Sequence, residues 1–137
     1  RPPEAMKTVF ADAFYFVALL NRADQHHSRA VAAARKLRDN LLTTEWVLTE
    51  LADALAKSSS RALIAPFIRT LEQDPNVTIV PATHHLLNLG LRLYEERRDK
   101  EWSLTDCISF VVMTDAGIEA LTGDKHFAQA GFTALLE

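Results

Sequence analysis

Several residue types and patterns are scarce in this 137-residue sequence, and each scarcity argues against a class of protein. The single cysteine, Cys107, cannot form an internal disulfide, and its place in an apolar run favours a reduced, buried thiol. With four glycines and neither a GxGxxG nor a Walker pattern, an enzyme built on a nucleotide cofactor is disfavoured. The longest apolar runs, such as ALIAPFI, are far shorter than the ~20 residues that span a bilayer, and no secretory leader precedes the first apolar segment. We therefore expect a soluble, cytoplasmic protein that does not enter a membrane.

The charge is nearly balanced, with 15 basic residues against 18 acidic ones and a net charge of −3. A protein that coats nucleic acid through phosphate contacts alone carries a basic excess, so this class is disfavoured. The balance does not exclude chemistry on phosphates, because a divalent cation held by clustered acids neutralises them and lets a phosphate approach. The placement of the acids is therefore more informative than their sum.

The length and the 48% hydrophobic content suit one compact domain, which we expect to span residues 7–136. The opening RPPEA, residues 1–5, is interpreted as leader or vector-derived sequence. Apolar patterning predicts strands at residues 8–11, 41–44, 77–81, 120–122 and 131–135. It predicts helices through residues 16–20 and at 24–40, 45–57, 61–71 with a break or kink near Pro66, 84–99 and 102–117, and a loop at GDKHF. Apolar strands that alternate with helices indicate an α/β fold with a mainly parallel sheet covered on both faces.

Four acidic residues stand at strand ends or near helix starts of this predicted fold. Asp12 and Asp124 follow predicted strands, at the sheet edge where α/β folds bind ligands. Glu50 lies in the second turn of the helix at 45–57, and Asp106 lies near the start of the helix at 102–117. Each acid also has an ordinary structural explanation: Asp12 could cap a helix, Glu50 could face solvent, and Asp124 could be a turn residue.

The ordinary explanation of Asp106 is a helix cap within WSLTDCISFVVMTDAG. Ser103 followed three residues later by Asp106 matches a helix start in which the third residue reaches back to the cap. Helical spacing also aligns Asp106 with Phe110 and Met113, on a face apolar enough to be buried. A buried carboxylate is costly unless it is paired, hydrogen-bonded or bound to metal, so capping alone leaves this placement unexplained.

Taken together, the four acids converge on one edge of the predicted sheet. Mg²⁺ and Mn²⁺ bind carboxylate oxygens and keep several waters, which leaves room for a phosphate. Such a metal activates a water, orients it for in-line attack and stabilises charge on the phosphate oxygens. The pattern therefore indicates metal-assisted hydrolysis of a phosphodiester.

The order of these residues resembles the PIN domain family, whose best-known bacterial members are the VapC-type toxin ribonucleases. The resemblance rests on Asp12 after the first strand, Glu50 in TTEWVLTELADAL, Asp106 in WSLTDCISF and Asp124 in ALTGDKHFAQAGF, and runs over essentially the whole of residues 7–136. It implies a three-layer α/β/α sandwich and a Mg²⁺- or Mn²⁺-dependent endoribonuclease, in which these four acids bind the metal and Thr105 supplies a catalytic hydroxyl. It also implies an RNA substrate, a homodimer and a cognate antitoxin protein that blocks the cleft.

One position departs from the family pattern. Many members carry Thr, Ser or Asn shortly after the first acid, where this sequence has Ala13 and Phe14. Loss of a hydrogen bond that supports a metal ligand can cost ~10- to 100-fold in metal affinity or activity. Two other functions therefore stay open beside the ribonuclease. One is a non-catalytic PIN-like module that binds RNA or protein; the weaker one is an acid-cluster phosphatase or phosphoacceptor domain, which would carry a second acid shortly after Asp12.

A histidine and a basic run complete the candidates. His126 lies two residues after Asp124 and could touch substrate, although a packing role is favoured. A basic run precedes the third acid and could contact RNA phosphates, but a solvated helix end is favoured for most of its members. The run consists of Arg92, Arg97, Arg98 and Lys100.

Overall fold

A computed structural model describes residues 7–136 of the chain, and the interpretation of residues 1–5 lies outside the described residues. The centre of the fold is a four-stranded sheet of order β3-β2-β1-β4, in which each neighbouring pair is parallel. Its strands are β1 (Thr8–Ala11), β2 (Asn40–Thr44), β3 (Val77–Val80) and β4 (Ala120–Leu121). The predicted parallel sheet is confirmed, and the carboxyl ends of its strands meet at one edge.

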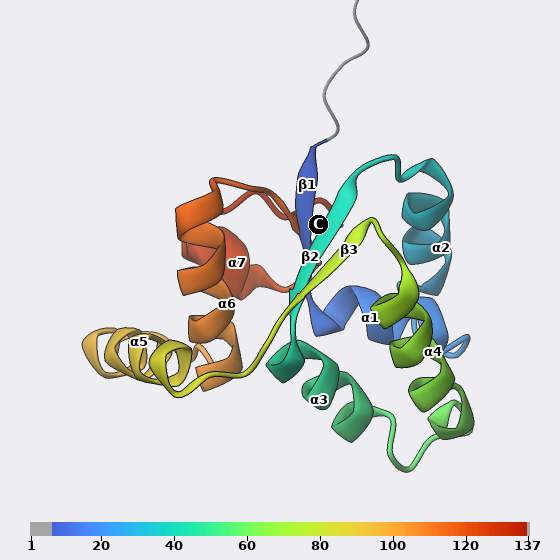
Figure 1. The fold of residues 1–137 in the computed structure, drawn as a ribbon, viewed down its shortest axis with the longest axis horizontal. Helices are drawn as coiled ribbons and strands as arrows, with labels where there is room; N and C mark the ends of the chain where they lie inside the picture. The colour runs from blue at the N-terminus through green and yellow to red at the C-terminus, as the bar shows by residue number, and fades with distance from the viewer. Residues whose placement is uncertain (1–6, 137) are drawn as a thin grey trace, which may run out of the picture.

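Seven helices within residues 7–136 cover the sheet. Figure 1 shows α2 and α4 on one side of the sheet and α6 and α7 on the other, with α5 packed outside α6. This is the predicted three-layer α/β/α sandwich. None of the described helices combines the length and the apolarity needed to cross a membrane. The helices are α1 (Ala13–Leu20), α2 (His27–Lys36), α3 (Glu45–Ala54), α4 (Arg61–Gln73), α5 (His84–Glu96), α6 (Leu104–Ala116) and α7 (Lys125–Gln129).

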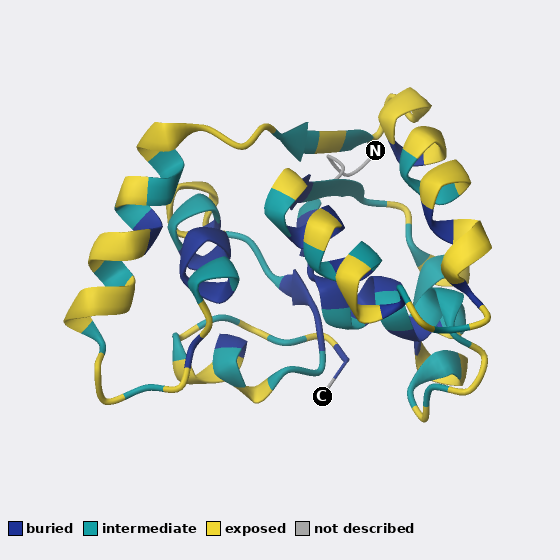
Figure 2. Ribbon diagram, turned by 90° about the horizontal axis from the view of Figure 1, so that it is seen from below, coloured by how far each residue is buried: buried dark blue, intermediate teal, exposed yellow. Residues whose placement is uncertain are grey.

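The core is built from β1 and the inward faces of the helices, where Figure 2 shows the buried residues. Aromatic rings form its centre on one side of the sheet. Phe110 of α6 meets Phe127 of α7 edge-on, with ring centroids 4.9 Å apart, and Phe127 lies 6.5 Å from Phe10 of β1. All three rings are fully buried. This packing fixes α6 and α7 against the central strand, so that the first turns of both helices are held in place.

Two sequence-based predictions near the C-terminus are wrong. GDKHF is not a loop, because Asp124 caps a helix by accepting a hydrogen bond from the backbone N of His126 at 2.9 Å, and α7 begins at the next residue. The strand predicted at residues 131–135 is reduced to one isolated parallel bridge between Ala120 and Ala134. Gly131, at a φ of 93°, turns the chain before this bridge, and backbone hydrogen bonds still join residues 133–136 to residues 120–122.

Helix α4 continues through Pro66, so the break allowed for at that residue does not occur. Proline lacks the N–H that would bond to the carbonyl four residues earlier, and one missing bond leaves the remaining turns of the helix in place. The hydroxyl of Thr70 donates to the Pro66 carbonyl oxygen at 2.9 Å, one turn further along. The other helices begin and end within a few residues of their predicted limits.

Candidate metal centre

Asp12 lies at the carboxyl end of β1, where it caps α1. It is only 3% exposed. Its Oδ2 accepts hydrogen bonds from the backbone N of Phe14 at 3.4 Å and from the hydroxyl of Thr122 at 3.0 Å. Its Oδ1 is buried and has no hydrogen-bond partner among the described residues. A buried carboxylate oxygen without a partner is costly, which makes it a candidate ligand for a cation.

Asp106 lies in the first turn of α6 and closes a reciprocal cap with Ser103. The backbone N of Asp106 donates to Ser103 Oγ at 3.0 Å, and the backbone N of Ser103 donates to Asp106 Oδ2 at 3.3 Å. The predicted cap is therefore confirmed. The same carboxylate is 6% exposed, and its Oδ2 lies 3.1 Å from Nδ1 of His126. Asp106 is thus both a helix cap and a member of a polar cluster.

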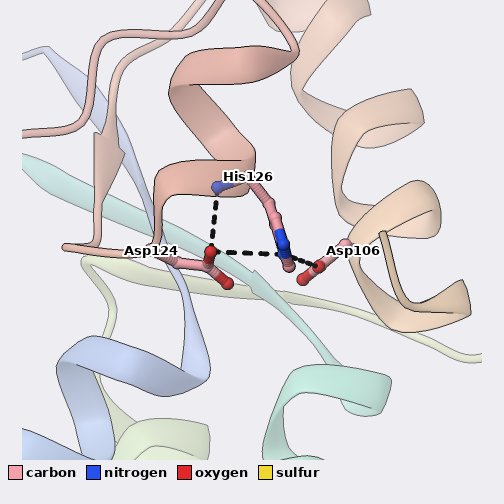
Figure 3. Close-up of side chains that lie close together, drawn as sticks. All are labelled: Asp106, Asp124 and His126. Atoms are coloured by element: carbon pink, nitrogen blue, oxygen red, sulfur yellow. Dashed lines mark hydrogen bonds and ion pairs between the residues drawn. The ribbon is translucent and has the colours of Figure 1, made fainter. Parts of the chain in front are cut away.

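Asp124 and His126 complete this cluster, as Figure 3 shows for the ring of His126 between two carboxylates. Nδ1 of His126 lies 3.3 Å from Asp124 Oδ1 and 3.1 Å from Asp106 Oδ2. One possible ligand atom from each of these three residues lies within 4.8 Å of the other two. The sequence favoured a packing role for His126, but its ring contacts both acids instead.

Glu50, on α3, lies near enough to the cluster to be affected by its charges. It is half-buried, and burial raises its pKa, as do the nearby charges of Asp106, Asp124 and Asp53. Asp53, one turn further along the same helix, is thus a like-charge neighbour of Glu50. Within residues 7–136, neither Glu50 nor Asp12 belongs to the group of ligand atoms that lie within 4.8 Å of one another. The structure thus brings two acids and a histidine into contact and places the other two acids around them.

In the absence of a cation, burial and mutual repulsion make it unfavourable for all the carboxylates of the site to be ionised at once. Burial raises the pKa of Asp12 from 3.8 to about 7, and the charges of Asp106 and Glu50 act in the same direction. The hydrogen bond from Thr122 opposes this rise. Burial also raises the pKa of Asp106, with a further contribution from the charge of Asp124. A bound divalent cation would reverse these shifts, because it stabilises the ionised carboxylates.

The three aspartates share a pattern in the use of their oxygens. Asp12 and Asp106 each accept all their hydrogen bonds through Oδ2, and Asp124 accepts its bond through Oδ1. Within residues 7–136, the second oxygen of each carboxylate accepts none. Each of the three carboxylates is therefore fixed by hydrogen bonds to one oxygen, and its other oxygen is left without a hydrogen bond among the described residues. Carboxylate oxygens are donors that suit Mg²⁺ or Mn²⁺, whereas the imidazole nitrogen is held by the two carboxylates themselves.

Thr122 is part of the site but was not among the residues predicted from the sequence. It is fully buried at the end of β4, where its hydroxyl donates to Asp12 and accepts from the backbone N of Asp124 at 3.0 Å. Its place two residues before Asp124, after a strand, is the only sequence signal for it. The Asp12 carboxylate therefore has a hydroxyl donor even though Ala13 and Phe14 replace the usual polar residue.

Thr105, the predicted catalytic hydroxyl, is half-buried beside Asp106. No hydrogen bond joins it to the four acids among the described residues. In the basic run, Arg97 donates to both carboxylate oxygens of Asp99 at 2.9 and 3.0 Å, and its guanidinium lies 4.9 Å from the ring centroid of Trp102. That arginine is engaged within its own segment, as expected for a helix end.

Comparison with known proteins gives one family and a set of similar solved structures that includes VapC20 and FitAcB. A model of the PIN domain matches residues 9–133. The structure of VapC20 from Mycobacterium tuberculosis, described as a toxin that cleaves the sarcin–ricin loop, matches with a TM-score of 0.84 and 24% identity, over 93% of this chain and 98% of that one. The structure of FitAcB from Neisseria gonorrhoeae matches with a TM-score of 0.64 and 18% identity, over 92% and 95%. No curated protein gives a significant match.

Proposed function

Because the chain belongs to the PIN domain family, we propose that it is a Mg²⁺- or Mn²⁺-dependent endoribonuclease and the toxin of a toxin–antitoxin pair. The observation that carries the proposal is the buried, unpartnered Oδ1 of Asp12, in a carboxylate whose pKa is raised partly by the charge of Asp106. A site assembled only to cap helices would not leave such an oxygen buried and unpaired.

Four carboxylates would hold the metal, from Asp12, Glu50, Asp106 and Asp124. When bound, a divalent ion in such a site activates a water and stabilises charge on the phosphate oxygens. The chain's own residues hold the ligands in place: the helix-start hydrogen bonds fix the three aspartates, and Thr122 ties Asp12 to the loop that carries Asp124. Thr105 remains the candidate for a catalytic hydroxyl beside the third acid.

The substrate and partners follow from the family and its known members. VapC20, which shares this fold, is described as cleaving the sarcin–ricin loop, and this supports an RNA substrate here. We expect residues 7–136 to act as one domain, to form a homodimer and to be inhibited by an antitoxin protein. A ribonuclease of this kind acts where cellular RNA is, so we place it in the cytoplasm. Expression of this protein in bacteria should arrest growth. Coexpression of the protein encoded immediately upstream should relieve that arrest, and the two proteins should co-elute as a complex.

Cleavage of a panel of structured RNAs, including a sarcin–ricin loop, tests the activity. Asp106→Asn keeps a side-chain oxygen for the cap with Ser103 but removes the charge, so the variant should fold. Removal of a residue that only supports a metal ligand costs up to ~100-fold in activity. Because Asp106 is itself proposed as a ligand, we expect the cleavage rate of Asp106→Asn to fall by at least ~100-fold. Asp115→Asn, at the exposed far end of the same helix, is the matched control and should cleave like the wild type. Activity that persists undiminished in Asp106→Asn or in a chelator would refute the mechanism.

The alternative is a non-catalytic PIN-like module that binds RNA or protein. The replacement of the usual polar residue by Ala13 and Phe14 is the observation that favours it. Titration calorimetry with Mg²⁺ and Mn²⁺ separates the two functions. The ribonuclease requires metal binding that weakens in Asp106→Asn, whereas the module predicts no metal binding by either protein.

A further inference from the structure

Phe14 lies at the rim of the metal centre and is in contact with two of its parts. Its backbone N donates to the Asp12 carboxylate at 3.4 Å. Its ring rests on Gly123, where an added Cβ would come within 2.6 Å of Phe14 Cζ. Because Gly123 directly precedes Asp124, the ring lies against the loop that carries the fourth acid. Phe14 as a whole is half-buried.

A second ring extends this aromatic surface. The ring centroid of His26 lies 4.8 Å from that of Phe14, with the two planes inclined at 47°. His26 precedes α2, but its side chain makes no capping hydrogen bond. Its ring is half-buried, and the polar neighbour of its Nε2 is the exposed Gln25 side chain at 3.2 Å. The imidazole therefore has no structural hydrogen bond within the described residues that would account for its place beside Phe14.

The charge of the protein makes such an aromatic surface useful in a ribonuclease. The net charge is −3, and the site itself is lined by carboxylates. Phosphate contacts supply much of the affinity of most proteins for nucleic acid, and a net negative charge does not favour them. Aromatic rings that stack on bases add affinity beyond that of the phosphate contacts, and they do so with little regard to sequence.

We propose that Phe14 and His26 form a stacking platform for a base next to the scissile phosphate. This inference rests on the proposed ribonuclease function and specifies its substrate. A base can reach the two rings only when it is unstacked from its neighbours, so the site takes a nucleotide from a single strand, a loop or a bulge rather than from a regular duplex. The aromatic residue that departs from the family pattern thus acts in substrate binding.

Stopped-flow measurements on a short single-stranded RNA carrying 2-aminopurine at one position test the platform, because stacking quenches this base before cleavage. Phe14→Leu keeps an apolar side chain against Gly123 but removes the ring face. We expect it to lose the quench and to raise KM roughly 5- to 150-fold, the range that loss of one base–aromatic contact gives. His26→Ala should act in the same direction, and His26→Phe, which restores a ring, should recover the quench.

The matched control is Tyr94→Leu, which removes an aromatic ring that is 48% exposed on α5 and should leave KM and the quench as in the wild type. If Phe14→Leu proves unstable in thermal unfolding, the pair His26→Ala and His26→Phe carries the test, because His26 is only half-buried. Cleavage with wild-type KM in both Phe14→Leu and His26→Ala would overturn the platform while leaving the ribonuclease in place. Absence of both cleavage and quenching in the wild type would overturn the stacking platform and the ribonuclease function together.

Discussion

Asp12 should make the stability of the metal-free protein fall as the pH rises. Burial, with smaller contributions from the charges of Asp106 and Glu50, raises its pKa from 3.8 to about 7. The folded protein therefore binds this proton more tightly than the unfolded chain does. The stabilisation is fully present below pH 3.8 and is lost progressively as the pH rises to about 7, above which Asp12 is ionised in both states.

The size of the effect follows from the two pKa values. A difference of one in pKa corresponds to about 1.4 kcal/mol, so ionisation of Asp12 lowers the free energy of unfolding by up to about 4 kcal/mol. Asp12→Asn removes the ionisation and keeps a side-chain oxygen for the bonds from Phe14 and Thr122. We expect the variant to exceed the wild type in stability by up to about 4 kcal/mol at pH 8 and to differ little at pH 4.

Urea unfolding in a chelator at these two pH values measures the difference. Titrating groups that do not interact with Asp12 affect the wild type and the variant alike, so the comparison reports Asp12 together with its coupling to Asp106 and Glu50. Asp115→Asn removes an exposed acid and should show no such dependence. Mg²⁺ at pH 8 should stabilise the wild type more than Asp12→Asn, because a ligand that binds only the folded state adds to its stability. A difference between wild type and Asp12→Asn that is the same at pH 4 and pH 8 would refute the reasoning.

Two further predictions concern the residues that hold the site together. Gly123→Ala should destabilise the protein by roughly 1 to 3 kcal/mol, because its Cβ would come within 2.6 Å of Phe14 Cζ. Chemical denaturation measures this loss, and an equal penalty in a Phe14→Ala background would show that the two residues do not meet. Thr122→Val should weaken Mg²⁺ binding ~10- to 100-fold in calorimetry, since Asp12 loses its hydroxyl donor. Thr43→Val, which removes a buried hydroxyl bonded to a backbone carbonyl instead, should leave metal affinity unchanged, and equal effects of both would rule out a specific role.

The parts of the site that the sequence predicts are those with local signals. Asp12 follows a short apolar strand, and Ser103 stands three residues before Asp106. The local sequence therefore predicts both the strand end and the helix cap. The parallel order of the strands then brings the first acid to the same edge as Asp124. These predictions hold because each depends on neighbours within a few residues and on one rule about sheet edges.

The parts that the sequence does not predict depend on contacts between distant segments. Thr122 is 110 residues from Asp12, and nothing in ALTGD marks its hydroxyl as the donor to that carboxylate. The ring of His126 reaches Asp106 only because Asp124 starts a helix where the composition suggests a loop. The final segment bonds to residues 120–122 over only a few residues, and the extent of this pairing depends on distant segments of the fold rather than on the pattern at 131–135.

In each of the three aspartates, one carboxylate oxygen accepts the helix-start hydrogen bond and the other accepts none within residues 7–136. This has a consequence for how the fold changes over evolutionary time. Asparagine in place of Asp12, Asp106 or Asp124 keeps the oxygen that holds the helix start and removes only the charge. A descendant that has lost its chemistry in this way would keep its fold and would gain stability at Asp12. Selection for stability therefore acts against Asp12 and Asp106, whose pKa values are raised in the folded protein, and their joint presence in one chain reflects a requirement other than folding.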